Sequence, residues 1–501
     1  MRQYSRSTLL FVDDHHILYR SGTRRTIHPL TRHSTEPVIP ATHPWELAIG
    51  WMSVYRDPDT GKYQLWYQAY SNIEKPTPTP DTFVCYAESD DGIAWNKPTL
   101  GLFPYKDIAD TNIVLVGNGG RSIRYANSVV VDPRETDPNK RYKMGYFDFT
   151  VDAGGADRPG LCVALSPDGI HWTKHPQAPL SPVGHFNHGD LVPLSHEPET
   201  GPAWHVPLSM SDTVDIFWDP QREVWAWYGK SWLDGPDGRM GWKHGMGRTQ
   251  SNDFVHWSTP ELLLTPDDDD PPHMEFHSAP VFYLDGAYFC LNQVLDRATK
   301  GGVIDIELGL SRDGLNFIRP FRDALFLARS PDPTSFDAGC ILTNASPIIL
   351  DDEIRFYYGG YDQGATGADD TTLTSGVGLA TIPRGRFAGI SPVACSDQQT
   401  LLTPLNHIGQ VTLKPLDLSR IESITLNADA RQSSIRVEML TERGLRLKDF
   451  TKEDALPITG DALDHPVVWR EKSLADLGEG LFILRVHLER ATVYAIDLLQ
   501  H

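Results

Sequence analysis

The chain has 501 residues, 40% of them hydrophobic, which suits a globular protein of two to four domains. Its formal net charge of −21 argues against nucleic-acid binding, because an acidic surface repels phosphates. No stretch approaches the roughly 18 apolar residues of a membrane span, and Leu9–Val12 is too short for a signal-peptide core. The five cysteines are far apart and lack metal-binding spacing, which indicates reduced thiols and a cytoplasmic protein.

A short motif recurs along the chain after strand-like runs. "SDDGIAW" begins at Ser89 and "SPDGIHW" at Ser166, and looser copies are "SNDFVHW" from Ser251 and "SRDGLNF" from Ser311. The fifth strand of this kind, Ser375–Thr381, ends in the degenerate "IPRGRF". The Asp-Gly pair predicts a tight turn, and the aromatic residue three positions later is expected to pack back on the sheet.

A second pattern lies upstream of each copy, namely a hairpin with an Asp at its turn. The five hairpins begin at Ser53, Ser128, Asp215, Pro280 and Pro347. Together the two patterns predict four strands per unit and five units over about residues 45–390, which is typical of a β-propeller. We expect the N-terminal 44 residues to add a hairpin and a strand that help to close the ring.

The repeat ends near Ala394. Five alternating stretches follow, "GQVTLKPLDL", "SITLNADA", "SSIRVEML", "LFILRVHL" and "ATVYAIDLL", with polar turns between them. They predict a β-sandwich over residues 394–501 after a propeller over residues 1–393. The predicted fold is therefore all-β, a five-bladed propeller followed by a C-terminal sandwich.

This architecture resembles the invertase and inulinase glycoside hydrolases of family 32, and the propeller is similar to family 43 arabinanases and to mannoside phosphorylases. "WMSVYRDPDTGKYQLWYQ" (51–68) echoes the strand pairing around the invertase motif, and Arg56-Asp57-Pro58 matches the "RDP" of that group. Asp57, however, falls at a hairpin turn, where a structural cap is expected. The resemblance implies a distant, separate family and a ligand site over the starts of the innermost strands.

Glycoside hydrolysis commonly uses two carboxyl groups that flank the scissile bond. Acids precede or begin four of the five inner strands: Glu46, Asp212, Glu275 and Asp337. The remaining unit offers Arg124 and Asn127, which suit sugar hydroxyls or a carboxylate.

We expect Glu275 to be the general acid, with a pKa raised by its apolar neighbours. A structural salt bridge at a blade junction is the alternative. Asp212 and Glu46 compete for the role of nucleophile or base. Asp337 is expected to tune the other carboxylates or to cap its own turn.

Other residues are assigned to substrate binding or to loops. Trp45 is expected to stack on a sugar face or to belong to the core, and His277 to contact substrate. "HFNHGD" (185–190) has His, His and Asp within metal-like reach, but it is one short cluster, and we expect a substrate-contacting loop there. "PDDDDPP" (266–272) lacks the Gly and the spaced ligands of a calcium loop and is expected to be a solvated acidic loop. We therefore expect no metal and no cofactor.

The sequence thus favours an exo-acting glycosidase for a small furanoside-type oligosaccharide, of fructose- or arabinose-like units. Two alternatives stay open: a glycoside phosphorylase or transglycosylase, with Arg124, His273 and His277 near the phosphate, and a non-catalytic carbohydrate-binding propeller. No nucleic acid or membrane partner is expected, and the sequence is compatible with an oligomer.

Overall fold

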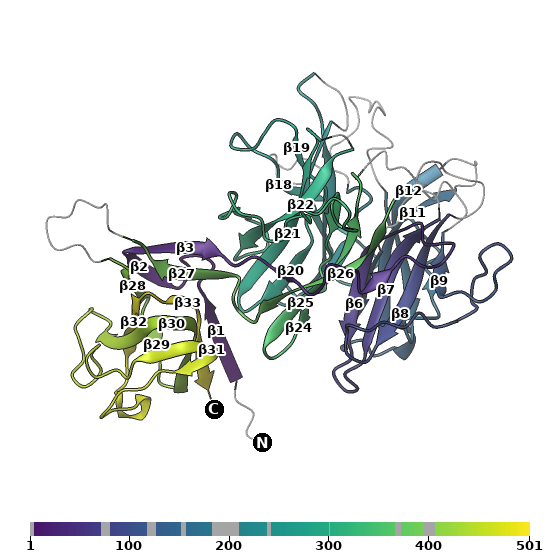
Figure 1. Ribbon diagram of the computed structural model, residues 1–501. Coiled ribbons are helices and arrows are strands. Elements are labelled where there is room, and N and C mark those ends of the chain that lie inside the picture. Colours follow the sequence, from purple (N-terminus) through teal and green to yellow (C-terminus); the bar gives the residue numbers. More distant parts are fainter. Residues whose placement is uncertain are drawn as a thin grey trace, which may run out of the picture. The chain divides into compact units, whose positions relative to one another are not determined.

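The computed structural model describes residues 5–71, 81–117, 127–151, 157–182, 210–237, 242–299, 301–365, 372–394 and 406–500. Contacts divide the chain into two units. The propeller unit comprises Thr31–Ile348 and Arg355–Thr381, and the sandwich unit comprises Met1–Leu30, Ile349–Ile354 and Ile382–His501. Both are built from β-strands, which confirms the predicted all-β class (Figure 1).

The described part of the propeller unit contains five groups of strands, here called blades. In blades 1 to 3 the four strands lie side by side in chain order, whereas in blades 4 and 5 the first two strands both pair with the third. A parallel pairing of Ile304 with Cys340 joins blades 4 and 5 into one continuous sheet. Blade 1 is β6 (Ala48–Arg56), β7 (Tyr63–Tyr70), β8 (Thr82–Ser89) and β9 (Ile113–Val116). Blade 2 is β10 (Asn127–Val131), β11 (Tyr142–Val151), β12 (Asp157–Ser166) and β13 (Thr173–Lys174). Blade 3 is β15 (Asp215–Asp219), β16 (Val224–Leu233), β17 (Lys243–Ser251) and β18 (Glu261–Leu264). Blade 4 is β19 (Met274–Phe276), β20 (Val281–Leu284), β21 (Ala287–Asp296) and β22 (Val303–Ser311). Blade 5 is β23 (Cys340–Leu342), β24 (Ile348–Ile349), β25 (Glu353–Tyr361) and β26 (Ser375–Pro383).

Hydrogen bonds link each blade to the next and the last blade to the first. Each blade is bonded to the next: Val129 N to Ser53 Oγ (2.9 Å), Ile216 N to Ser128 Oγ (2.8 Å), Ser278 Oγ to Asp215 Oδ2 (3.5 Å), Gln293 Nε2 to the Thr343 carbonyl (3.3 Å) and Val54 N to Ser346 Oγ (3.1 Å). Short polar side chains at these positions let the inner strands approach closely. These sheets and the links between them are consistent with the predicted propeller.

The repeated Asp-Gly turn joins neighbouring blades. Trp66 of blade 1 donates its indole N–H to the Gly169 carbonyl at the end of blade 2, at 2.6 Å. Tyr228 bonds the Gly314 carbonyl in the same way, and Tyr357 bonds the Gly92 carbonyl, each at 2.6 Å. The glycines are required here, because each has a positive φ and a Cβ would meet the aromatic ring. The motif thus holds neighbouring blades together, and each pair of glycine carbonyl and aromatic donor is called a latch below.

The hairpin Asp residues cap their own turns, as expected. Asp57 Oδ1 accepts the backbone N–H groups of Asp59 and Thr60, each at 2.9 Å. Asp219 does the same for Gln221 and Arg222. The literal match of Asp57 to the invertase motif therefore has a local structural cause.

The N-terminal segment divides between the two units. β4 (Thr31–Arg32) and β5 (Ile39–Pro40) pair with β26 of blade 5, so this part does complete a blade. β1 (Ser5–Leu10), β2 (Ile17–Ser21) and β3 (Thr23–Ile27) instead pair with β33, β28 and β27 of the sandwich unit. The hairpin expected to close the ring thus joins the other sheet, because its apolar residues Leu9, Phe11 and Ile17 belong to that unit's core.

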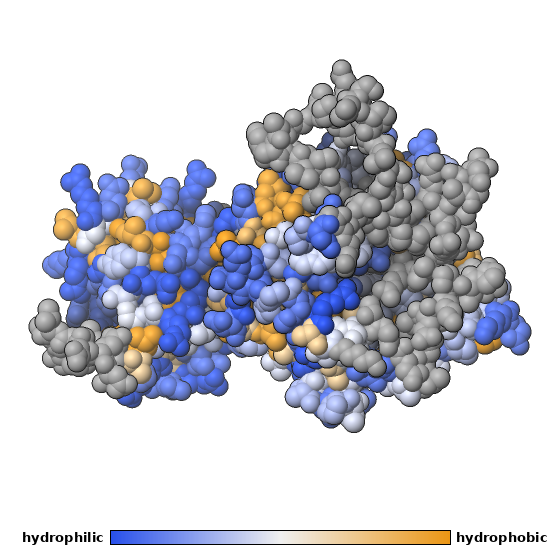
Figure 2. Space-filling view, turned by 90° about the horizontal axis from the view of Figure 1, so that it is seen from above, coloured by the Kyte–Doolittle hydropathy of each residue, from blue (hydrophilic) through white to orange (hydrophobic). Residues whose placement is uncertain are grey.

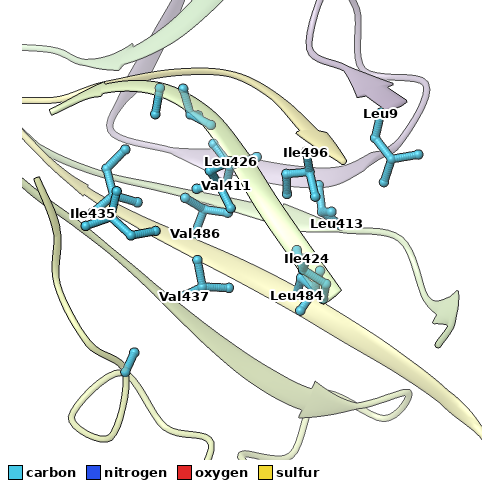
Figure 3. Close-up of a cluster of buried hydrophobic side chains, with 14 of the residues drawn as sticks. Leu9, Val411, Leu413, Ile424, Leu426, Ile435, Val437, Leu484, Val486 and Ile496 are labelled. Carbon is cyan, nitrogen blue, oxygen red and sulfur yellow. The ribbon is translucent and has the colours of Figure 1, made fainter. Parts of the chain in front are cut away.

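The sandwich unit contains β27 (Ala388–Pro392), β28 (Ile408–Leu413), β29 (Leu416–Asp417), β30 (Ile421–Thr441), β31 (Ile458–Pro466), β32 (Leu481–Glu489) and β33 (Thr492–Gln500). Two strands were expected where β30 is continuous, since "ARQS" contains no turn-forming Gly or Pro. The first part of β30 pairs with β33 and its second part with β32. Leu426, Val411 and Val486 point into the space between the layers (Figure 3).

The described residues on the face seen in Figure 2 are largely polar. Blue and pale residues predominate among the coloured atoms in Figure 2, and the orange apolar residues form scattered patches. Within the described residues, no helix has the length and apolar content needed to cross a bilayer.

Candidate active site

Glu275 lies on β19 at the start of blade 4 and is only 6% exposed. Arg297, which follows β21, donates its Nε to Glu275 Oε1 at 2.7 Å. His244 of β17 contacts the other oxygen through Nδ1 at 2.6 Å and donates its backbone N–H to it at 3.2 Å. Blades 3 and 4 therefore meet at this carboxylate, which fits the predicted blade-junction ion pair.

The surroundings of Glu275 correct the expected direction of its pKa. Burial by itself raises the pKa, but the hydrogen bonds and charges of His244 and Arg297 outweigh burial and lower it to about 2. The apolar neighbours in the sequence were a poor guide, because the two basic partners come from other strands. These contacts favour an ionised Glu275 at neutral pH, and its expected role as general acid stays a prediction.

Asp212 precedes β15 and lies in the same cluster. Its Oδ1 is 2.5 Å from the Lys230 ammonium of β16, and its side chain is 22% exposed, against 8% for Glu275. The charges of Lys230 and Asp212 both act on His244 and on His277. The structure therefore brings together Asp212, Glu275 and His277 of the residues predicted from the sequence.

Trp51 brings blade 1 to this cluster. A bulge between Gly50 and Met52 interrupts the pairing of β6 with β7, and Trp51 has a φ of 44°. Its indole stacks on the imidazole of His277, with ring centres 5.6 Å apart. Bulges and positive φ values often re-aim side chains at functional sites. His277 Nδ1 also contacts Gln293 Oε1 at 3.2 Å, and burial holds its pKa well below the usual value.

Glu46 has a different environment in blade 1. Its Oε1 accepts the Tyr67 hydroxyl at 2.6 Å, and its Oε2 accepts the Lys97 ammonium at 2.7 Å and two backbone N–H groups. The residue is 3% exposed. These partners differ from those of Asp212 and Glu275, so the catalytic role of Glu46 stays a prediction.

Trp45 and Asp337 are both enclosed. Trp45 is 2% exposed, stacks on His43 at 4.5 Å and donates to Asn112 at 3.2 Å, so it presents no open face to a sugar in this conformation. Asp337 is fully buried, and its carboxylate binds Arg32, Ser335 and Tyr358. These contacts fit the expected core and turn-capping alternatives.

Of the remaining predicted binding residues, Asn127 begins β10 and donates to the Trp66 carbonyl at 3.4 Å, while its Oδ1 is buried with no hydrogen-bond partner among the described residues. Arg124 lies outside the described residues, as does the segment 185–190.

The acidic loop 266–272 is held by arginines. Asp270 pairs with Arg319 at 2.5 Å, and Asp267 pairs with Arg322 at the same distance. No group of three His, Cys, Asp or Glu side chains suited to a metal occurs in the described parts of the chain.

The sequence analysis missed four residues of the cluster: Lys230, His244, Arg297 and Trp51. It considered only the starts of inner strands, whereas Lys230 and His244 lie on the second and third strands of blade 3. Lys230 is the single basic residue of a largely aromatic strand, "VWAWYGKSWL", and that contrast was an available signal. The strand "KHGMGRTQS" contains three basic residues, so its sequence does not single out His244.

No family model matches the chain, and no curated protein matches it. Solved structures with a similar fold include a glycosyl hydrolase from Bacteroides ovatus, with 16% identity over 71% of this chain and 94% of that one, at a TM-score of 0.45. A GH32 β-fructofuranosidase from Bombyx mori covers 93% of this chain and 94% of its own, with 13% identity and a TM-score of 0.39. A thermostable family-43 glycoside hydrolase has 15% identity over 66% of this chain and 88% of its own, at a TM-score of 0.41.

Proposed function

We propose that the protein is a glycoside hydrolase that releases terminal sugars from a furanoside-type oligosaccharide of fructose- or arabinose-like units. The observation that carries the proposal is the joining of two carboxylates, Asp212 and Glu275, in one buried cluster at the starts of blades 3 and 4. Two carboxyl groups at one site are the usual equipment for cleaving a glycosidic bond.

The two carboxylates have different surroundings and so different proposed roles. Asp212 is the more exposed and faces the sugar, where it attacks the anomeric carbon or activates water. Glu275 stays ionised and stabilises the positive charge that develops on the sugar ring. As the bond to the anomeric carbon breaks, the oxygen of the departing sugar takes up a proton from water. Trp51 and His277 stack on each other beside them. Glu46 stays a proposed third carboxylate.

One observation favours a phosphorylase as the second candidate. Lys230, His244, His277 and Arg297 gather four basic side chains around the site, which is the composition that holds phosphate. Lys230 and Arg297 are already paired with Asp212 and Glu275, and this pairing favours hydrolysis.

Sugar release from a panel of aryl glycosides, fructans and arabinans, with and without phosphate, tests the proposal. Hydrolysis predicts release from furanosides at a rate that phosphate leaves unchanged. Release only with phosphate indicates the phosphorylase. No release from any substrate, together with sugar binding by calorimetry, contradicts both and indicates a binding propeller.

A further inference from the structure

His244 is held from one side by Glu275. It lies on β17 and is 3% exposed, with Nδ1 at 2.6 Å from Glu275 Oε2 and its own backbone N–H bonded to the same oxygen. Arg297 fixes the other oxygen of the carboxylate at 2.7 Å. The three residues form a chain in which each positions the next.

This contact determines which ring nitrogen of His244 carries the proton. A nitrogen lone pair and a carboxylate oxygen repel each other, so a separation of 2.6 Å requires a proton between them. Nδ1 is therefore protonated in the neutral imidazole, and Nε2 carries a lone pair. Both ring nitrogens are buried, and neither makes a hydrogen bond of good geometry among the described residues, but Nδ1 has the 2.6 Å contact with Glu275 Oε2, which leaves Nε2 as the nitrogen with a free lone pair. Leaving such an acceptor unpaired is unfavourable, so its retention calls for a functional partner.

Building on the proposed function, we propose that His244 determines specificity: its Nε2 accepts a hydrogen bond from a hydroxyl group of the bound sugar, and Glu275 is its positioning residue. An acceptor fixed in this way selects a donor. It favours a hydroxyl at this point of the ligand and disfavours a carboxylate or phosphate oxygen.

The neighbours of the ring are consistent with a neutral imidazole. Trp232 packs on it at 3.9 Å between ring centres, and the ring of His277 is 6.5 Å away. Burial lowers the pKa of His244, the Lys230 charge acts in the same direction, and Glu275 and Asp212 oppose it. Nε2 is thus an acceptor at neutral pH and becomes a donor when the ring is protonated in acid.

His244→Asn separates this role from a structural one. The amide nitrogen of Asn replaces Nδ1 and can still donate to Glu275, but no acceptor remains at the Nε2 position. We expect a folded protein whose Tm stays close to that of the wild type. The KM for 4-nitrophenyl α-L-arabinofuranoside or sucrose rises about tenfold, which corresponds to about 1.4 kcal/mol. His244→Gln, whose amide reaches the Nε2 position, restores part of the affinity.

The outcomes separate this inference from the proposed function. If the wild type cleaves a substrate and His244→Asn has the same KM, the inference fails and the function stands. If the wild type cleaves neither substrate, calorimetry with D-fructose and L-arabinose decides. Binding that weakens about tenfold in the Asn variant supports the inference while the function fails, and binding that is absent or unchanged overturns both. An Asn variant that unfolds, with no rescue by Gln, assigns His244 to structure and also overturns the inference.

Discussion

The latch between blades can be tested by adding one methyl group at Gly169. This residue has a φ of 77°, and a Cβ built on it would lie 2.5 Å from Trp66 Cζ2 and 3.0 Å from the Tyr142 ring. Gly169→Ala therefore strains the backbone, overpacks the turn and disturbs the 2.6 Å bond from Trp66. These effects together destabilise the propeller by about 3–6 kcal/mol.

Differential scanning calorimetry of the full chain measures this effect. We expect the Tm of Gly169→Ala to fall by about 4–8 °C. Gly286→Ala is the matched control, because Gly286 has a φ of 78° but its nearest neighbour, Arg312, is 3.9 Å from the added Cβ. The control has only the conformational cost of about 1–2 kcal/mol. Equal losses in the two variants would refute the latch.

Three further predictions concern buried charge, and thermal unfolding at several pH values checks each of them. The pKa of Glu275 is lowered to about 2 in the folded state, so its carboxylate contributes stability above the unfolded pKa, and this stability is lost as the pH falls through about 2. Glu275→Gln should therefore lower the free energy of unfolding by about 3 kcal/mol at pH 6 and by much less near pH 2. An equal loss at both pH values would contradict this prediction. Burial raises the pKa of Asp215 to about 8, so the folded protein keeps this carboxyl group protonated and loses stability as the pH rises from about 4 to about 8. Asp215→Asn should therefore raise the Tm at pH 8 but not at pH 4, and a lower Tm at pH 8 would count against this reasoning. Arg319 lies between Asp270 and Glu307, and all three side chains are at most 4% exposed. Arg319→Met should lower the free energy of unfolding by about 3–5 kcal/mol, because it leaves two buried carboxylates without their cation. An unchanged free energy of unfolding would show that water reaches these carboxylates.

Periodic patterns made most of the fold predictable. Strands and turn caps follow from local sequence, so the runs before the repeated motif and the hairpin around Asp57 are found where expected. The pairing of β1 with β33 joins residues almost five hundred positions apart, and the sequence of β1 does not indicate which strand it pairs with. The sequence likewise predicted Gly169 only as part of a turn, and its contact with Trp66 could not be predicted because Trp66 lies in the neighbouring blade.

The candidate site was less predictable, for a physical reason. The position of Asp212 and Glu275 follows from counting inner strands, but the state of Glu275 depends on Arg297 and His244, which its own neighbourhood does not reveal. Ionisation is set by charges that the fold brings together, and not by the hydropathy of adjacent residues.

Sugar release by Asp212→Asn, on whichever furanoside the wild type cleaves, tests the central claim most directly. The control is Asp268→Asn, an exposed carboxylate of the loop 266–272. If the site lies in the cluster of blades 3 and 4, Asp212→Asn lowers kcat at least about a hundredfold in a protein that is still folded at the assay temperature, and the control keeps wild-type activity. Wild-type kcat in Asp212→Asn would contradict the account and place the chemistry elsewhere in the propeller.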